Sequence, residues 1–400
     1  MIETLLANDR VRAARHHIER SDETTLARQA SLSAIPAPTG SERARAAGVA
    51  RMLTEVGLSD VHVDEVGNVR GWYGAGSREQ GAESVVLSAH LDTVFGPELD
   101  VSVSRKGPRL EGPGISDNAR GLAALITVGE ALTRARVETR RPVLFAATVG
   151  EEGSGDLRGV RHLFGPSGRL AARPAAFIAL DGAGIERIVH RALGARRYRV
   201  TFNGPGGHSW AAYGVANPAD AVGRAIDRIA SIPTRHAPRT THSIVGLGGG
   251  TSLNCIPQSA WFDVDLRSED PRALESLDAA VHQVLEQVLA DSNRMRQAGT
   301  APLTSDVRRV GDRPSGLTPR SHPLVQAAVA ATRALGHEHQ LSCASTDANM
   351  PISLGVPAVA LGAGGRAGDA HLPTEWYENE KGALGIVRAL LVTAAMAEAC

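Results

Sequence analysis

The sequence has few aromatic residues (4%), few cysteines and no excess of either charge. Its 43 basic residues equal its 43 acidic residues, so no net charge attracts nucleic acid or an anionic membrane. The cysteines Cys255, Cys343 and Cys400 are widely spaced and odd in number, so they predict no disulfide framework. No uninterrupted apolar stretch reaches eighteen residues, and the first thirty residues lack the apolar core of a signal peptide. These absences predict a cytoplasmic protein.

The length and the spacing of apolar runs predict the fold class. A chain of 400 residues exceeds what one hydrophobic core usually serves, so we expect two domains. Short apolar runs at 84–92, 141–152 and 175–184 are each followed by polar residues, and the apolar spacing over 117–136 is that of a helix. Continuous apolar strands alternating with helices predict an α/β domain whose mostly parallel sheet is flanked by helices.

The pattern changes near residue 194, where "RRYRVTFNG" and "QSAWFDVDLRS" alternate polar and apolar residues. This alternation is typical of half-exposed antiparallel strands. We therefore expect a discontinuous catalytic domain over 1–193 and 316–400, interrupted by a smaller α+β domain over 194–315. The other expected elements are a helix capped by Ser41, helices over 217–231 and 270–291, strands over 304–316 and 357–364, and helices beginning at Pro323 and Glu378.

Residues that bind metals or carry protons follow the apolar strands and one loop: His90, Asp92, Asp117, Glu151, Glu152, Asp181 and His371. Each has a simpler interpretation alone: a hydrogen-bonded histidine at a strand end, an aspartate that caps its helix, two solvated glutamates, a turn aspartate. Ligand sites in parallel sheets, however, lie beyond the carboxyl ends of the strands. Five separate segments that direct such groups to one edge favour a common site.

Two divalent cations would account for this set. Histidine and carboxylate ligands suit zinc, and two zinc ions about 3.5–4 Å apart can share one carboxylate. Asp117 is the expected bridge, with His90 and Asp181 on one metal and Glu152 and His371 on the other. Manganese and cobalt also accept ligands rich in carboxylate.

Two acidic residues remain outside this ligand set. Asp92, two residues after His90, is expected to accept the second imidazole N–H and orient the ring. Glu151 would take a proton from water and pass it to a leaving amine. In this interpretation the cations offset the repulsion between Glu151 and Glu152.

Several motifs in fixed order resemble the M-twenty metallopeptidases, which include peptidase T, cytosolic dipeptidases, glutamate carboxypeptidase and aminoacylase. They are "SAHLDTV", "GEEGSGD", "GPGGHSW", "GGTSLNCIP", "DVDLRS" and "GDAHLPTEW", and the resemblance covers nearly the whole chain. It implies a di-zinc catalytic domain with an inserted lid or dimerisation domain. It also implies the same five metal ligands and Glu151 as the general base.

The resemblance implies further roles for three residues of the insert. His208 matches a histidine that reaches the partner's active site in dimeric relatives and stabilises the oxyanion, which suits an imidazolium donor. Asn254 and Arg267 match substrate contacts, the arginine through a substrate carboxylate. The alternatives are structural: His208 caps its turn, Asn254 holds its loop, and Arg267 pairs with Asp263 or Asp265.

The sequence departs from many relatives at Asn118, where an aspartate or lysine is common, and we expect this to alter hydrogen bonding around the metals. Asp181 and "STDANMPISLGVP" favour the branches that cleave small peptides. The predicted function is hydrolysis of an amide bond in small peptides by a water or hydroxide bridging two zinc ions, in a homodimer. The alternatives are an N-acyl-amino-acid deacylase and a non-catalytic metal-binding scaffold.

Overall fold

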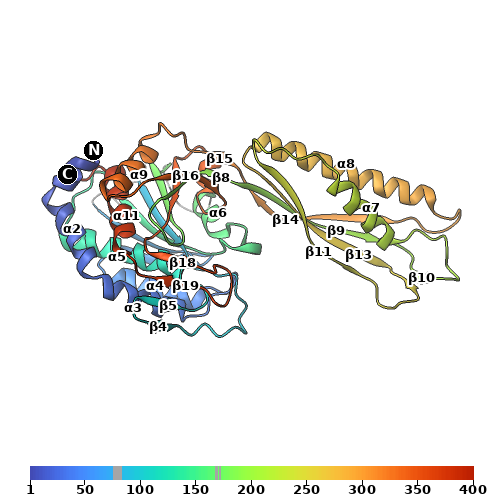
Figure 1. Cartoon of the computed structure of the whole chain (residues 1–400), viewed down its shortest axis with the longest axis horizontal. Helices are drawn as coiled ribbons and strands as arrows, with labels where there is room; N and C mark the ends of the chain where they lie inside the picture. Colours follow the sequence, from blue (N-terminus) through green and yellow to red (C-terminus); the bar gives the residue numbers. More distant parts are fainter. Residues whose placement is uncertain (75–82, 167–169, 171–172) are drawn as a thin grey trace. The chain divides into compact units, whose positions relative to one another are not determined.

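The computed structural model describes residues 1–74, 83–166, 170 and 173–400, and the chain divides into two compact units (Figure 1). The first unit comprises Met1–Ala192 and Leu317–Cys400, and the second comprises Leu193–Gly316. The second unit is therefore an insertion in the chain of the first.

The first unit is built on a nine-stranded sheet in the order β1-β2-β6-β3-β7-β17-β8-β15, with β16 paired to β8. Strand β3 runs parallel to both β6 and β7, and β17 runs parallel to β7. All residues of these four strands are buried, which explains their continuous apolar sequences. The predicted mostly parallel sheet is confirmed. The strands are β1 (Ser59–Val63), β2 (Val69–Tyr73), β3 (Val85–His90), β6 (Val143–Thr148), β7 (Ala176–Leu180), β8 (Arg187–Ala192), β15 (Gly316–Leu317), β16 (Gln340–Ala344) and β17 (Ala358–Leu361).

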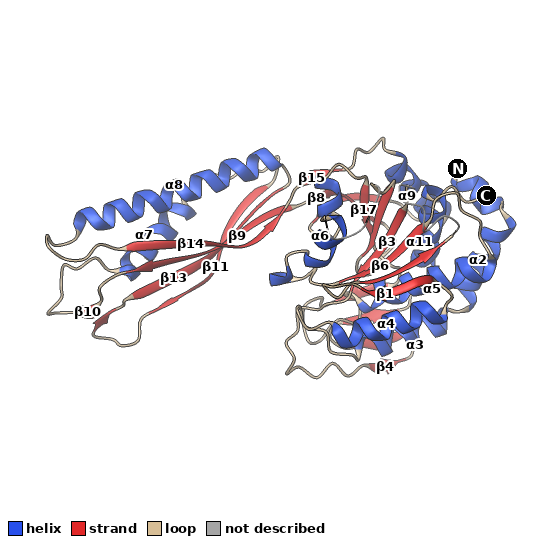
Figure 2. Ribbon diagram, turned by 180° about the vertical axis from the view of Figure 1, so that it is seen from behind, coloured by secondary structure: helices blue, strands red, loops and turns tan. Residues whose placement is uncertain are grey.

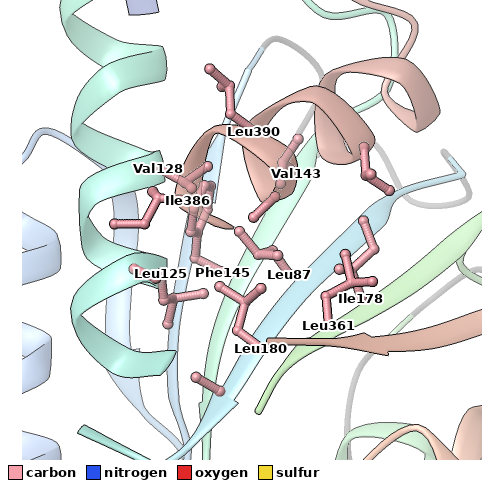
Figure 3. Close-up of a cluster of buried hydrophobic side chains, with 14 of the residues drawn as sticks. Leu87, Leu125, Val128, Val143, Phe145, Ile178, Leu180, Leu361, Ile386 and Leu390 are labelled. Atoms are coloured by element: carbon pink, nitrogen blue, oxygen red, sulfur yellow. The ribbon is translucent and has the colours of Figure 1, made fainter. Parts of the chain in front are cut away.

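Helices cover both faces of this sheet. The larger core lies between the sheet and helices that include α5 and α11, and each fully buried leucine or phenylalanine there contributes about 1.5–3 kcal/mol. Figure 3 shows side chains of α5 and α11 against those of the strands: Leu125, Val128, Ile386, Leu390, Leu87 and Phe145. A second core on the other face contains Val160 of α6 and Ile352 of α10. The helices are α1 (Ile2–Ala7), α2 (Asp9–Arg20), α3 (Asp22–Ser33), α4 (Arg43–Glu55), α5 (Ala119–Ala135), α6 (Arg158–Phe164), α9 (Pro323–Ala334), α10 (Asn349–Ser353) and α11 (Ala383–Met396).

The first unit also contains a small antiparallel sheet in the order β18-β19-β5-β4. Its strands are β4 (Ser104–Lys106), β5 (Arg109–Glu111), β18 (Arg366–Gly368) and β19 (Trp376–Glu378). The prediction of a helix beginning at Glu378 was wrong, because 376–378 pair with β5 and bury Tyr377, and α11 begins only at Ala383.

The predicted helix cap Ser41 was also wrong, and the alternative in which Asp117 caps its helix does not hold either. Helix α4 has Glu42, and not Ser41, as its N-cap residue, without a side-chain capping bond. Helix α5 is capped by Asn118, whose Oδ1 accepts a hydrogen bond from the Gly121 amide at 3.1 Å. Asp117 is thereby left for another role.

The second unit is a four-stranded antiparallel sheet, β11-β13-β9-β14, with helices α7 and α8 on one face (Figure 2). Residues of β13 alternate between buried and partly exposed, as the sequence pattern predicted. Its elements are β9 (Gly194–Asn203), β10 (Gly207–His208), α7 (Pro218–Ala230), β11 (Thr240–Gly249), β12 (Cys255–Ile256), β13 (Ser259–Ser268), α8 (Pro271–Met295) and β14 (Thr304–Arg313). Among the described residues of both units, no helix has the length and apolar character needed to cross a bilayer.

Candidate metal centre

The sheet topology brings the predicted site residues to one edge. His90 is the last residue of β3, Glu151 and Glu152 follow the end of β6 at Thr148, and Asp181 follows β7. Because β3 lies between β6 and β7 and is parallel to both, the carboxyl ends of all three strands meet there.

Three of the predicted ligands form a tight cluster at this edge. His90, Asp117 and Glu152 each place one ligand atom within 4.8 Å of the other two. Nε2 of His90 lies 2.9 Å from Oδ1 of Asp117. His90 and Glu152 are buried, so this is no solvated loop.

His371 approaches the same cluster from the loop between β18 and β19. Its Nε2 lies 3.3 Å from Oδ2 of Asp117 and 3.1 Å from Oε1 of Glu152. The hydrogen bonds to Asp117 and Glu152 raise the pKa of His371 to about 10. Asp117 therefore contacts both histidines, one with each oxygen.

Asp181 lies outside the three-residue cluster, but its charge interacts with it. Burial, and then the negative charges of Asp117 and Glu152, raise the pKa of Asp181 to about 7. Its amide donates to the carbonyl of Leu361 at 3.0 Å. A nearby cation would shift a carboxyl group in such surroundings toward its charged form.

Asp92 contacts His90 and also the backbone of both glutamates. Its carboxylate accepts hydrogen bonds from the amides of Glu151 and Glu152, both at 2.9 Å, and from Oγ1 of Thr39 at 2.8 Å. Nδ1 of His90 lies 3.1 Å from the Asp92 carbonyl and 3.5 Å from its carboxylate. Burial raises the pKa of Asp92, but His90 and the two amides lower it overall. The buried carboxylate of Asp92 thus holds the backbone of both glutamates, while the hydrogen bond to the His90 ring involves the Asp92 carbonyl.

Glu151 is buried beside the cluster, with 5% of its surface exposed. The turn that presents it begins at Gly150, whose φ of +63° is a conformation that favours glycine. The negative charge of Glu151 contributes to raising the pKa of His90. The arrangement holds a second carboxylate next to the ligands without making it one of the three clustered residues.

Asn118 ties the Asp117 segment to the end of β7. Its Nδ2 donates to the carbonyl of Leu180 at 2.8 Å, while its Oδ1 caps α5. Asn118, the residue that departs from many relatives, therefore joins the segment of Asp117 to the strand end that precedes Asp181.

The donor set fits divalent metal ions. Oδ1 of Asp117 is buried and, within the described residues, accepts no hydrogen bond of acceptable geometry, although Nε2 of His90 is only 2.9 Å away. Two electron-pair donors that approach each other without a directed hydrogen bond suit a cation between them. Imidazole and carboxylate ligands favour zinc and also accept manganese or cobalt.

His208 and Asn254 lie together in the inserted unit. The amide of Ser209 donates to the Asn254 carbonyl at 2.9 Å, and His208 pairs with Cys255 between β10 and β12. Nδ1 of His208 accepts from the amides of Trp210 at 3.2 Å and Ala211 at 3.4 Å. Nδ1 of His208 therefore caps its turn, which is the contact that the structural alternative proposed.

Arg267 lies far from that pair within the same unit. It is eight residues along β13 from Ser259, which is about 26 Å of extended strand. Its Nε donates to Asp265 at 2.8 Å, as the structural alternative proposed. Neither η nitrogen donates a hydrogen bond to any described residue, and the side chain is 40% exposed. Both η nitrogens of the guanidinium are therefore without a hydrogen-bond partner among the described residues.

Histidines and carboxylates that converge at the carboxyl edge of a mostly parallel sheet define a metallohydrolase of the α/β class. The chain belongs to peptidase family M20/M25/M40, whose sequence model matches residues 86–397.

The individual proteins that resemble this chain have low sequence identity to it. Over 130 residues the chain is 28% identical to the uncharacterized protein YgeY of Escherichia coli (strain K12), and this match spans 30% of each protein. The fold is similar to that of a tripeptidase from Staphylococcus aureus, with a TM-score of 0.76, 20% identity, and coverage of 94% of this chain and 98% of that one. It is also similar to an amidase of the hydantoinase/carbamoylase family from Burkholderia vietnamiensis, with a TM-score of 0.70, 20% identity, and coverage of 96% and 97%. At these identities the two structures establish a shared fold and leave the substrate open.

Metal binding is expected to release protons. In the metal-free protein at pH 7, His371 is protonated and Asp181 is about half protonated, because their pKa values are raised to about 10 and about 7. Since metal ligands must be deprotonated, about one proton from His371 and about half a proton from Asp181 should leave per chain, with a further contribution from His90, whose pKa is also raised, and affinity should rise with pH. Calorimetric zinc titrations at pH 7 in buffers of different ionisation enthalpy measure this release.

The same pKa shifts make the stability of the metal-free protein depend on pH. Both groups hold protons in the folded chain at pH values where they have lost them in the unfolded chain. Stability should therefore fall as pH rises, first through about 7 and then through about 10. A titration heat independent of buffer would contradict the expected proton release, and an affinity unchanged between about pH 6 and 9 would contradict the expected rise of affinity with pH.

Proposed function

We propose that the protein hydrolyses an amide bond in short peptides with two divalent metal ions, most suitably zinc, bound at the candidate centre. The observation that carries this proposal is the contact of Asp117 with both His90 and His371, one through each carboxylate oxygen. Asp117 would bridge the two ions. His90 and Asp181 would complete one coordination set, and Glu152 and His371 the other. Bound ions of this kind polarise a carbonyl and supply a nucleophilic water at neutral pH.

Glu151 would act as the general base and then as the general acid. Its backbone is held by Asp92, and its carboxylate is buried beside the cluster. From there it would take a proton from the attacking water and deliver it to the departing amide nitrogen. The adjacent glutamates would divide the work: Glu152, which contacts His371, would bind metal, and Glu151 would carry the proton.

His208 would donate a hydrogen bond through Nε2 to the oxyanion of the tetrahedral intermediate. The amides of Trp210 and Ala211 fix Nδ1 as an acceptor, so the donor is in place without a further proton. Asn254, which adjoins His208, would contact the substrate on the same side.

Arg267 would bind a carboxylate of the substrate through its η nitrogens. Because about 26 Å of strand separates it from the His208 end of the insert, one small peptide does not reach both in a single chain. We therefore propose a homodimer in which a site uses Arg267 of one chain and His208 of the partner subunit. The edge strand β11 supports self-association, since within the described sheet it pairs only with β13 and exposes Val245 and Leu247.

The cysteines bear on the cellular compartment of the protein. The three cysteines are free, which suits a reducing cytoplasm. We propose a small peptide as the substrate, with neither nucleic acid nor a membrane as partner.

A substrate panel tests the function and separates it from the alternatives. Dipeptides and tripeptides with free amino termini should be cleaved with a kcat/KM at least about 100-fold above that of N-acetyl and other N-acyl amino acids. The reverse preference would assign the chain to amide deacylation. Metal binding without turnover of any compound would leave only a scaffold role and reject the proposal.

A further inference from the structure

Glu375 is a fully buried carboxylate in the loop that carries His371. Its Oε1 accepts hydrogen bonds from the Ser116 amide at 2.8 Å, the Ser116 hydroxyl at 2.6 Å and the Asp117 amide at 2.8 Å. Its Oε2 accepts from the Gly114 amide at 2.9 Å. All four donors belong to the segment that ends at Asp117.

The backbone of Glu375 holds the same two segments. Its carbonyl accepts from the Gly112 amide at 2.9 Å, and its amide donates to the Leu372 carbonyl at 3.0 Å. Leu372 in turn donates to Asp369 at 2.9 Å, which closes a turn around His371. One residue therefore joins the Asp117 segment to the turn that presents His371.

The Asp117 segment and the His371 loop must be held in position relative to each other. His371 and Asp369 have φ values of +68° and +57°, which are uncommon for residues other than glycine. Asp117 is a negative charge within a buried cluster and must point one oxygen at each histidine. Hydrogen bonds to a charged acceptor are roughly twice as strong as neutral ones, so the Glu375 carboxylate is an effective fastening.

We propose that Glu375 is a positioning residue of the metal centre: it locks the Asp117 segment to the His371 loop and so fixes the spacing of the shared ligand and the last histidine. This rests on the proposed function only in requiring that the centre binds metal. Glu375 touches neither substrate nor reacting atoms, and its effect passes through Asp117 and His371.

The substitution Glu375→Gln tests this role. A glutamine amide keeps the size of the side chain, but its NH2 group would face either the Gly114 amide or the three donors at Oε1, so at least one hydrogen bond is lost. We expect zinc affinity to fall about 10- to 100-fold, which is the usual effect of removing a partner that orients ligands. The cobalt-substituted protein should show a changed visible absorption spectrum, because the coordination geometry is no longer held. Glu380→Gln, a surface change near the same loop, is the control and should match the wild type.

Competition against a chromophoric chelator measures the affinity, and thermal unfolding of the metal-free variants reports folding. A folded Glu375→Gln variant with wild-type zinc affinity and cobalt spectrum would overturn the proposal. So would a lowered melting temperature without a change in metal affinity, since that result indicates a purely structural role. If Glu375→Gln does not fold, Ser116→Ala decides, because it removes only the hydroxyl donor: a smaller loss of affinity supports the proposal and an unchanged affinity rejects it. The readout is metal binding, so a wild type that binds zinc but hydrolyses no peptide would reject the proposed function and leave this inference standing.

Discussion

Replacement of Glu151 by glutamine is expected to lower kcat for peptide hydrolysis by about 10²- to 10⁴-fold while metal content stays near that of the wild type. The amide keeps the size of the side chain but accepts no proton from water. Because Asp92 binds the backbone amide of residue 151, the turn should keep its position in the variant. Steady-state kinetics and metal analysis on the same preparation measure both quantities.

Glu55→Gln is a suitable control, since Glu55 is exposed on α4 and remote in sequence from the candidate ligands. It should leave both kcat and metal content unchanged. Loss of metal from Glu151→Gln, or full activity in that variant, would contradict the assignment of residue 151 as the proton carrier.

Asp117→Ala is expected to remove both metals. Asp117 is the residue whose two oxygens approach the two histidines, at 2.9 Å from His90 and 3.3 Å from His371, so its loss disrupts both coordination sets. Metal affinity should fall by more than about 100-fold at each site, beyond the effect of removing a partner that only orients ligands. Turnover should fall below detection. Elemental analysis after dialysis against chelator-treated buffer gives the number of ions retained.

Asp181→Asn provides a graded comparison, because Asp181 is proposed to serve one metal only. It should reduce the content by about one ion per chain and leave the His371 side occupied. Retention of two tightly bound ions by Asp117→Ala would contradict the bridging role.

The core of the catalytic unit could be predicted because parallel strands buried on both faces have uninterrupted apolar sequences. The runs in β3, β6 and β7 are of this kind, and each lies within its predicted range. Strand β11 was not predicted, because it is rich in glycine and half exposed at a sheet edge and therefore lacks a strong strand signature. The helix start predicted at 378 was wrong because nothing in "TEWYENE" reveals that Trp376–Glu378 pair with β5, far away in the chain.

The candidate site, like the fold, could be predicted only in part. Residue types that bind metals indicated His90, Glu152 and His371, which the structure brings together around Asp117, whereas the predicted ligand Asp181 lies outside the three-residue cluster. The hydrogen bonds to the carboxylates of Asp92 and Glu375 were not predictable. Their donors are mostly backbone amides, which every residue has and which a sequence pattern therefore does not reveal. The distance between Arg267 and His208 was likewise hidden, since it depends on β13 running the length of the insert.

The most direct test of the account is a crystal structure of the zinc-loaded protein with anomalous diffraction data at the zinc edge. The account predicts two peaks about 3.5–4 Å apart, one on each side of the Asp117 carboxylate, with His90 on one ion and His371 on the other. A single peak, or two peaks that do not share Asp117, would contradict it.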